Sequence, residues 1–129
     1  MKFLKGSKGF DKLASKLNMI VLENGRGVAE LKVEEEHTNP MGTLHGGFTV
    51  TLVDIVSSFG LATHKNVSGG HISVDLHLSY FKSATIGDEI QIISETVKAG
   101  KTLAFLEVEI KNKKSGDVLV KGTHTKYIM

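Results

Sequence analysis

The sequence predicts an α+β domain in which a curved antiparallel sheet wraps around one long central helix, preceded by a short N-terminal helix. Three observations support this prediction. The 129 residues suffice for one domain that buries about two-thirds of the surface of its unfolded chain. The segment from Phe48 to Thr63 is apolar and exceeds the length of an ordinary strand. Beyond it, apolar and polar residues alternate between turn signals, as they do in strands joined by hairpins.

Residues 1–20 form the N-terminal helical segment of this single domain, which spans residues 1–129. Residues 1–16 carry five lysines against one acid, Asp11, and apolar residues interleave with them. This pattern predicts an amphipathic helix that starts near Phe10 and packs on the domain. Mitochondrial targeting segments have a similar pattern, although they favour arginine. Residence in the cytoplasm, in mitochondria or in both therefore stays open.

A first strand follows the turn formed by Asn24-Gly25 and Gly27. Its apolar residues run from Val28 to Val33, and it ends in the acidic residues 34–36. A loop from His37 to Leu44 is rich in turn formers, and Gly46-Gly47 then opens the long apolar segment. Because that segment is apolar on nearly all sides, it predicts a helix buried over most of its surface.

Four further strands follow a turn at residues 66–70. The first alternates from Ile72 to Tyr80, with apolar residues on one face and Ser73, Asp75, His77 and Ser79 on the other. The others are expected at residues 89–97, 103–110 and 118–128, joined by hairpins. A helix this apolar requires a curved sheet around it, which is the hotdog fold. A single copy leaves sheet edges and one helix flank uncovered, and a dimer joining two sheets edge to edge would remove one of these exposures.

Composition excludes several classes of function. The chain has no cysteine, which removes disulfides, thiolate chemistry and zinc–cysteine sites. The net charge of +2, with lysines interleaved among glutamates, argues against nucleic acid as a partner. No apolar run reaches the length of a transmembrane segment. The six histidines are too scattered to predict a metal site, and no dinucleotide, P-loop or G-x-S-x-G motif occurs.

The segment from Asn39 to Asp54 combines features that suit acyl transfer. The first N–H groups of a helix have no partner inside it, so Gly46 and Gly47 offer donors to a developing oxyanion. Asn39 can add a side-chain donor to the same oxygen. The alternative for the glycine pair is that the junction between loop and helix needs unusual backbone dihedral angles. The alternative for His45 is a loop histidine that is hydrogen-bonded to the backbone.

Asp54 lies two turns into the predicted helix. At helical spacing it shares a narrow polar stripe with Gly47 and with Ser57 or Ser58. A partly desolvated aspartate there fits a general base or a carboxylate nucleophile. The alternative is a buried carboxylate capped by the neighbouring hydroxyl groups.

Two further groups of residues are candidate ligand contacts. Ser73 and Asp75 are expected on the same strand face, where Ser73 can orient a water and Asp75 can bind a ligand hydroxyl or amine. The basic hairpin at Lys98, Gly100, Lys101 and Thr102 can hold phosphate groups of a coenzyme A. The alternatives are an ordinary solvent-facing strand and a solvated hairpin tip.

From about Val28 to Lys126, the chain resembles the PaaI-like group of hotdog-fold acyl-CoA thioesterases. The resemblance rests on Val33-Glu-Glu-Glu-His-Thr-Asn39, Gly42-Thr-Leu-His-Gly-Gly47, Thr51-Leu-Val-Asp54, Ser73-Val-Asp75, Gly100-Lys-Thr-Leu-Ala-Phe105 and His124-Thr-Lys126. Agreement at so many separated segments is more specific than the His-Gly-Gly triplet alone. The chain departs from the group at Pro40-Met41, in the acyl-side loop, and at Tyr127, where a histidine is expected.

The resemblance implies a role for each candidate. Asn39 and the Gly46 N–H polarise the thioester carbonyl, and His45 positions Asn39 or the thioester. Asp54 reaches in from the neighbouring subunit as general base or nucleophile, and Ser73 of that same subunit aligns the water. Coenzyme A lies along the subunit interface near several candidates, which are Asp75, Tyr80, Lys98, Gly100, Lys101 and Thr102.

The resemblance also implies properties of the whole protein. It implies hydrolysis of medium- to long-chain acyl-CoA without metal or cofactor, coenzyme A being part of the substrate. It implies a homodimer that assembles into a homotetramer, and a lipid-transfer protein as a partner. Two other functions remain open on this fold. One is a non-catalytic acyl-CoA-binding or regulatory protein, and the other is a dehydratase, for which no acid–base pair is evident.

Overall fold

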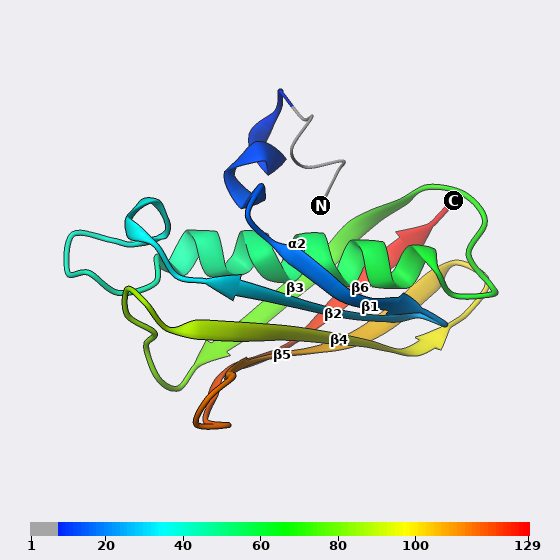
Figure 1. Ribbon diagram of the computed structural model, residues 1–129. Coiled ribbons are helices and arrows are strands. Elements are labelled where there is room, and N and C mark those ends of the chain that lie inside the picture. The colour runs from blue at the N-terminus through cyan, green and yellow to red at the C-terminus, as the bar shows by residue number, and fades with distance from the viewer. Residues whose placement is uncertain (1–7) are drawn as a thin grey trace.

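The computed structural model describes residues 8–129 and contains one long helix packed on a six-stranded antiparallel sheet (Figure 1). Helix α2 spans Gly46–Ala62. The strands are β1 Asn18–Glu23, β2 Arg26–Lys32, β3 His71–Tyr80, β4 Glu89–Ala99, β5 Leu103–Asn112 and β6 Val118–Ile128. They lie in the order β1-β2-β4-β5-β6-β3, so β1 and β3 are the sheet edges. The predicted hotdog fold is confirmed.

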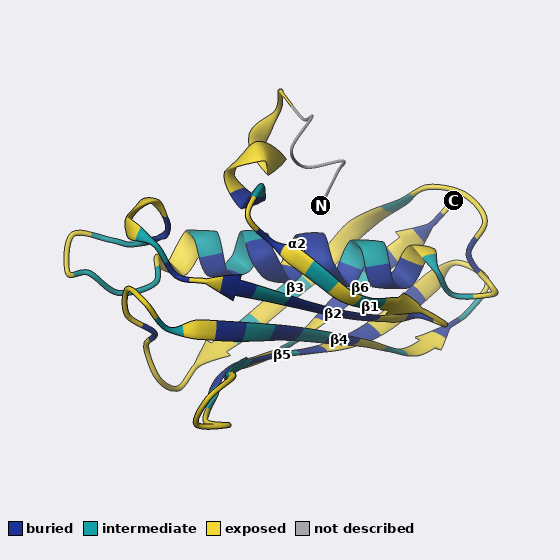
Figure 2. Cartoon of the chain, in the orientation of Figure 1, coloured by how far each residue is buried: buried dark blue, intermediate teal, exposed yellow. Residues whose placement is uncertain are grey.

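The core lies between α2 and the concave face of the sheet. Leu52, Val53 and Val56 of the helix are fully buried, as are Ile90 and Ile92 of β4. Figure 2 shows buried segments in both α2 and the sheet. The opposite flank of α2 faces outward. It carries exposed residues, which are Gly46, Gly47, Asp54 and Ala62. The prediction of an uncovered helix flank in a single copy is thus confirmed. Within residues 8–129, no helix combines the length and apolar character needed to cross a bilayer.

The N-terminal region differs from the prediction in one element. The short helix is present as a 3₁₀ helix, η1, at Phe10–Ala14, and strand β1, which was not predicted, follows it. The prediction of a helical segment that extends to residue 20 is therefore wrong for residues 18–20, which belong to β1. Asn24 and Gly25 both have positive φ, at 52° and 81°, as a two-residue hairpin turn into β2 requires. Lysines 2 and 5, with the targeting interpretation that includes them, lie outside the described residues.

Edge strand β3 contains a bulge that reverses one prediction. Ser73 pairs with Lys126, and Asp75 pairs with Thr125, so two residues of β3 advance against one of β6. Because side chains alternate between faces, the extra residue, Val74, places Ser73 and Asp75 on opposite faces. The prediction that they share a face is therefore wrong. Ser73 faces the helix, and Asp75 faces outward.

Candidate functional site

A tight loop before α2 fixes the side chain of Asn39. Its Oδ1 accepts hydrogen bonds from the backbone N–H groups of Met41 at 3.0 Å and Thr43 at 3.2 Å. Its Nδ2 donates to Thr43 Oγ1 at 2.8 Å. Gly42 has φ +80°, a left-handed conformation that lets the chain reverse between these contacts. An amide nitrogen carries two hydrogens, so Asn39 keeps one donor for a ligand.

The start of α2 is capped by the imidazole ring of His45. Its Nδ1 accepts a hydrogen bond from the Phe48 N–H at 3.2 Å. Within one chain, His45 is thus a loop histidine bonded to the backbone, which was the alternative to a role in positioning the substrate. Neither Gly46 nor Gly47 has a positive φ, so unusual dihedral angles do not explain why glycines occupy these two positions. At Gly47, a Cβ would lie 3.0 Å from the His45 ring. The exposed Gly46 N–H has no hydrogen bond among the described residues, which leaves it available to an incoming oxygen.

Tyr80, at the end of edge strand β3, reaches the same helix start. Its hydroxyl donates to the Gly46 carbonyl oxygen at 2.8 Å. Burial raises the pKa of the Tyr80 phenol, so the hydroxyl remains a donor near neutral pH. This contact fixes the position of the Gly46 peptide relative to the sheet edge.

Asp54 lies farther along the exposed flank of α2. It follows Gly46 by eight residues, which corresponds to about 12 Å along the helix axis. Its Oδ1 accepts a hydrogen bond from Ser58 Oγ at 3.2 Å. A shallow depression of about 260 Å³ surrounds Asp54, with Ser58, Phe59 and His71 in its wall. The expected partial burial of Asp54 is absent in the single chain, where this residue is exposed.

Behind Asp54 lies a buried polar cluster that the sequence analysis did not identify. His124 of β6 is fully buried and joins two hydroxyl groups, Ser73 Oγ to its Nε2 at 2.7 Å and Ser57 Oγ to its Nδ1 at 2.8 Å. Burial, helped by the charge of Lys126, lowers the pKa of His124 to about 4. The imidazole is therefore neutral at physiological pH and holds the Ser73 hydroxyl in a fixed position.

The second member of this cluster is Lys126. Its side chain is nearly fully buried, and its Nζ donates to Ser58 Oγ at 2.8 Å. Burial lowers the pKa of Lys126, while the negative charge of Asp54 acts to raise it. A sequence signal for both residues exists. His124 and Lys126 occupy alternate positions of a strand whose equivalent neighbours, Val120 and Ile128, are apolar and buried.

The candidate coenzyme A contacts do not converge within one chain. Lys98, Gly100, Lys101 and Thr102 lie at the β4–β5 hairpin, close to the C-terminus, because the Ile128 N–H donates to the Thr102 carbonyl. This hairpin lies at the end of the sheet opposite to the start of α2 and hence to Tyr80 (Figure 1). Asp75 faces the outer side of the sheet, away from the helix.

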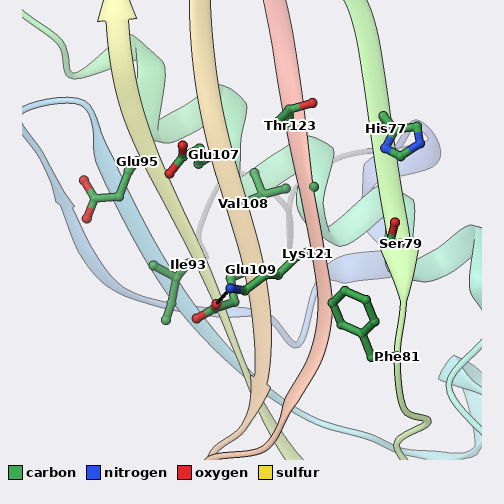
Figure 3. Close-up of a pocket in the computed structure, with 11 residues that line it drawn as sticks. His77, Ser79, Phe81, Ile93, Glu95, Glu107, Val108, Glu109, Lys121 and Thr123 are labelled. Carbon is green, nitrogen blue, oxygen red and sulfur yellow. Dashed lines mark ion pairs between the residues drawn. The ribbon is translucent and has the colours of Figure 1, made fainter.

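A larger hollow, of about 510 Å³, lies on the outer face of the sheet (Figure 3). Three acids line it, Glu95, Glu107 and Glu109, and Lys121 forms an ion pair with Glu109 at 3.7 Å. None of the candidate residues from the sequence lines this hollow. Among residues 8–129, no cluster of three side chains could hold a metal ion. The candidate site is therefore the exposed flank of α2 together with edge strand β3.

Comparison with known proteins agrees with this fold. Residues 41–119 match the sequence model of the thioesterase superfamily. Acyl-coenzyme A thioesterase 13 of Mus musculus is 41% identical over 99% of this chain and 91% of its own. The crystal structure of zebra fish thioesterase superfamily member 2 is 40% identical, covers 99% of this chain and 92% of its own, and has a TM-score of 0.95.

A more distant structure shares the fold alone. A hypothetical thioesterase of Streptococcus pneumoniae TIGR4, solved with coenzyme A, is 24% identical with a TM-score of 0.82 and covers 89% of this chain and 87% of its own. The superfamily match covers more than half of the chain, and the mouse relative aligns over nearly all of it. The chain therefore belongs to the thioesterase superfamily.

Proposed function

We propose that this protein hydrolyses acyl-CoA to a free fatty acid and coenzyme A. The observation that carries the proposal is the arrangement of α2, whose free Gly46 N–H and exposed Asp54 lie on its uncovered flank beside edge strand β3. The name of the mouse relative, an acyl-coenzyme A thioesterase, supports the substrate class.

The catalytic site is completed by a second copy of the chain. Since Gly46 and Asp54 are about 12 Å apart along one helix, they cannot act on one thioester group within a chain. Antiparallel pairing of two β3 strands brings the Tyr80 end of one copy beside the His71 end of the other. Tyr80 contacts Gly46, and His71 shares the depression around Asp54. The pairing thus brings Gly46 of one copy toward Asp54 of the other.

The apolar residues of edge strand β3 support this pairing. Ile72 and Val74 are 56% and 60% exposed in the single chain. An edge strand with exposed apolar side chains is a template for pairing with another chain. The dimer would cover these side chains and desolvate Asp54, which the single chain leaves exposed.

The reaction then follows from the donors and the carboxylate. The Gly46 N–H and Asn39 Nδ2 donate to the thioester oxygen as it becomes an oxyanion. Asp54 of the other copy either takes a proton from an attacking water, which Ser73 orients, or attacks the carbonyl carbon and forms an anhydride that water hydrolyses. In both routes the carbon–sulfur bond breaks, the thiolate takes up a proton, and one water is consumed as the acyl group leaves as a carboxylic acid.

The remaining candidates are proposed to bind the substrate. Lys98 and Lys101, with the backbone N–H of Thr102, offer a basic hairpin for the phosphate groups. Gly100 shapes this hairpin, because its N–H donates to the Leu103 carbonyl oxygen at 2.8 Å. Asp75 and Tyr80 offer polar contacts along the interface. The proposal takes several further properties from the family resemblance. These are medium- to long-chain acyl groups, assembly of dimers into a homotetramer, a lipid-transfer protein as partner, and residence in the cytoplasm, in mitochondria or in both.

The test is hydrolysis of acyl-CoA by the wild type, by Asp54→Asn and by mixed dimers. We expect Asp54→Asn to lower kcat about a hundredfold while substrate binding is largely kept. Dimers reassembled from Asn39→Ala and Asp54→Asn chains should regain about a quarter of wild-type activity, because half are mixed and each mixed dimer has one intact site. No recovery would refute the shared site. Tight binding of acyl-CoA by a wild type that does not hydrolyse it would instead favour a non-catalytic acyl-CoA-binding protein.

A further inference from the structure

Lys126 is the buried amine that the proposed mechanism leaves unused. Its side chain is 4% exposed, and it forms no ion pair with any carboxylate of residues 8–129. Its Nζ donates to Ser58 Oγ at 2.8 Å, and Ser58 Oγ in turn donates to Asp54 Oδ1 at 3.2 Å. A buried, unpaired ammonium group is costly, so its retention beside the candidate carboxylate calls for an explanation.

The direction of these two hydrogen bonds depends on the charge of the amine. An ammonium group has three donors and no acceptor, so the Ser58 oxygen must accept from it. The single Ser58 hydrogen is then directed to Asp54 Oδ1. A neutral amine has a lone pair that can accept the same hydrogen, which would release the carboxylate. Only the protonated form of Lys126 fixes the chain of donors from Lys126 through Ser58 to Asp54.

We propose that Lys126 is a positioning residue for Asp54, acting through Ser58 to hold Oδ1 and leave Oδ2 for the reaction. The inference rests on the proposed thioesterase function. The titratable groups near the amine are Asp54 of α2, His71 of β3 and His124 of β6. Asp11 of η1 lies in the wall of the depression around Asp54.

The first test compares activity with stability. Lys126→Met keeps the length of the side chain and removes its charge, and such a replacement of a buried ion is often neutral or stabilising. We expect kcat to fall about ten- to a hundredfold with KM nearly unchanged, since a misplaced reacting group has an effect of this size. The thermal unfolding temperature should stay equal or rise. A fall in kcat that tracks a loss of stability would overturn the proposal.

A double-mutant cycle tests the route through Ser58. If the two residues act as one chain, Lys126→Met combined with Ser58→Ala should lower kcat no more than the worse single change. Additive losses would overturn the proposal. The matched control is Lys121→Met. Lys121 lies on the same strand but faces the outer hollow, so this substitution should leave kcat unchanged (Figure 3).

The alkaline limb of the pH profile gives a readout that a purely structural role would not move. Burial lowers the pKa of Lys126, so wild-type kcat/KM should decline at a pH below the usual 10.5 of a lysine. That limb should disappear in Lys126→Met and persist in Lys121→Met. An alkaline limb that is unchanged in Lys126→Met would overturn the proposal.

A titration that needs no turnover separates this proposal from the proposed function. The ¹³Cε resonance of Lys126, assigned with the Lys126→Met variant, is followed against pH in the wild type and in Asp54→Asn. Because Asp54 acts to raise the pKa of Lys126, its neutralisation should move the midpoint to lower pH. An unchanged midpoint would overturn the coupling of the two residues. Absence of hydrolysis by the wild type, with the shift present, would overturn only the proposed thioesterase function.

Discussion

Protonation of the buried His124 should destabilise the protein in acid by a predictable amount. The ring is fully buried, both of its nitrogens are engaged by serine hydroxyl groups, and its pKa is lowered to about 4 from the ordinary value of 6.5. Above pH 6.5 the ring is neutral in both the folded and the unfolded chain, so it adds no pH dependence. Between pH 6.5 and 4 only the unfolded chain takes up the proton, and stability is lost as the pH falls.

The size of this effect follows from the linkage between proton binding and folding. Each pH unit in that window removes about 1.4 kcal/mol of unfolding free energy. Between pH 7.5 and 5.0 the histidine therefore contributes a loss of about 2 kcal/mol, since 1.5 of those units lie below 6.5. The full loss, of about 3.4 kcal/mol, is reached only below pH 4.

Urea unfolding at the two pH values, at one protein concentration, measures this contribution. The wild type should lose about 2 kcal/mol more than His124→Gln between pH 7.5 and 5.0, because the variant has no ring to protonate. His77→Gln is the matched control, since His77 is exposed on the outer face of the neighbouring strand. Equal losses in the wild type and His124→Gln would refute the reasoning, because the other titrating groups are common to both proteins.

Two further predictions concern packing and substrate binding. Gly27→Ala should destabilise the fold by about 1–3 kcal/mol in urea unfolding, because the added Cβ would lie 2.9 Å from the Val56 carbonyl oxygen of α2. A loss of unfolding free energy smaller than the error of the measurement would contradict this prediction, because it would show that β2 and α2 can move apart to accommodate the methyl group without destabilising the fold. Replacing Lys98 and Lys101 together by alanine should raise KM for acyl-CoA, more at low salt than at high salt, with kcat unchanged. A KM equal to that of the wild type at low salt would exclude the hairpin from phosphate binding.

The sequence was sufficient for the parts of the fold that repeat a strong pattern. The apolar segment predicts α2 within two residues at its start and one at its end, and the alternating stretches predict four of the strands. Strand β1 escaped prediction because an edge strand buries little. Ile20 and Leu22 are exposed, so no buried face imposed a regular alternation on this segment. The Asn24-Gly25 pair, a strong hairpin signal, was the evidence available for it.

The candidate site was predictable only where its chemistry is local. The Asn39 loop and the start of α2 are set by residues that neighbour one another in sequence, as their hydrogen bonds show. The cluster behind Asp54 depends on contacts between residues more than fifty positions apart, such as Ser73 with His124 and Lys126 with Ser58. A pattern along the chain could mark Lys126 as an inward-facing polar residue but could not name its partner.

The bulge at Val74 shows why edge strand β3 can serve both the proposed dimer and the site. Without the extra residue, Ser73 would share the outward face of Asp75 and would lie away from His124. With the bulge, the Ser73 hydroxyl faces the helix side of the sheet and contacts the neutral ring of His124, while the side chains of Ile72 and Val74 remain exposed. The pairing surface and the polar cluster thus come from consecutive residues of one strand. A bulge at this position is therefore a structural requirement for Ser73 to take part in chemistry across a dimer interface, and not an irregularity of the sheet.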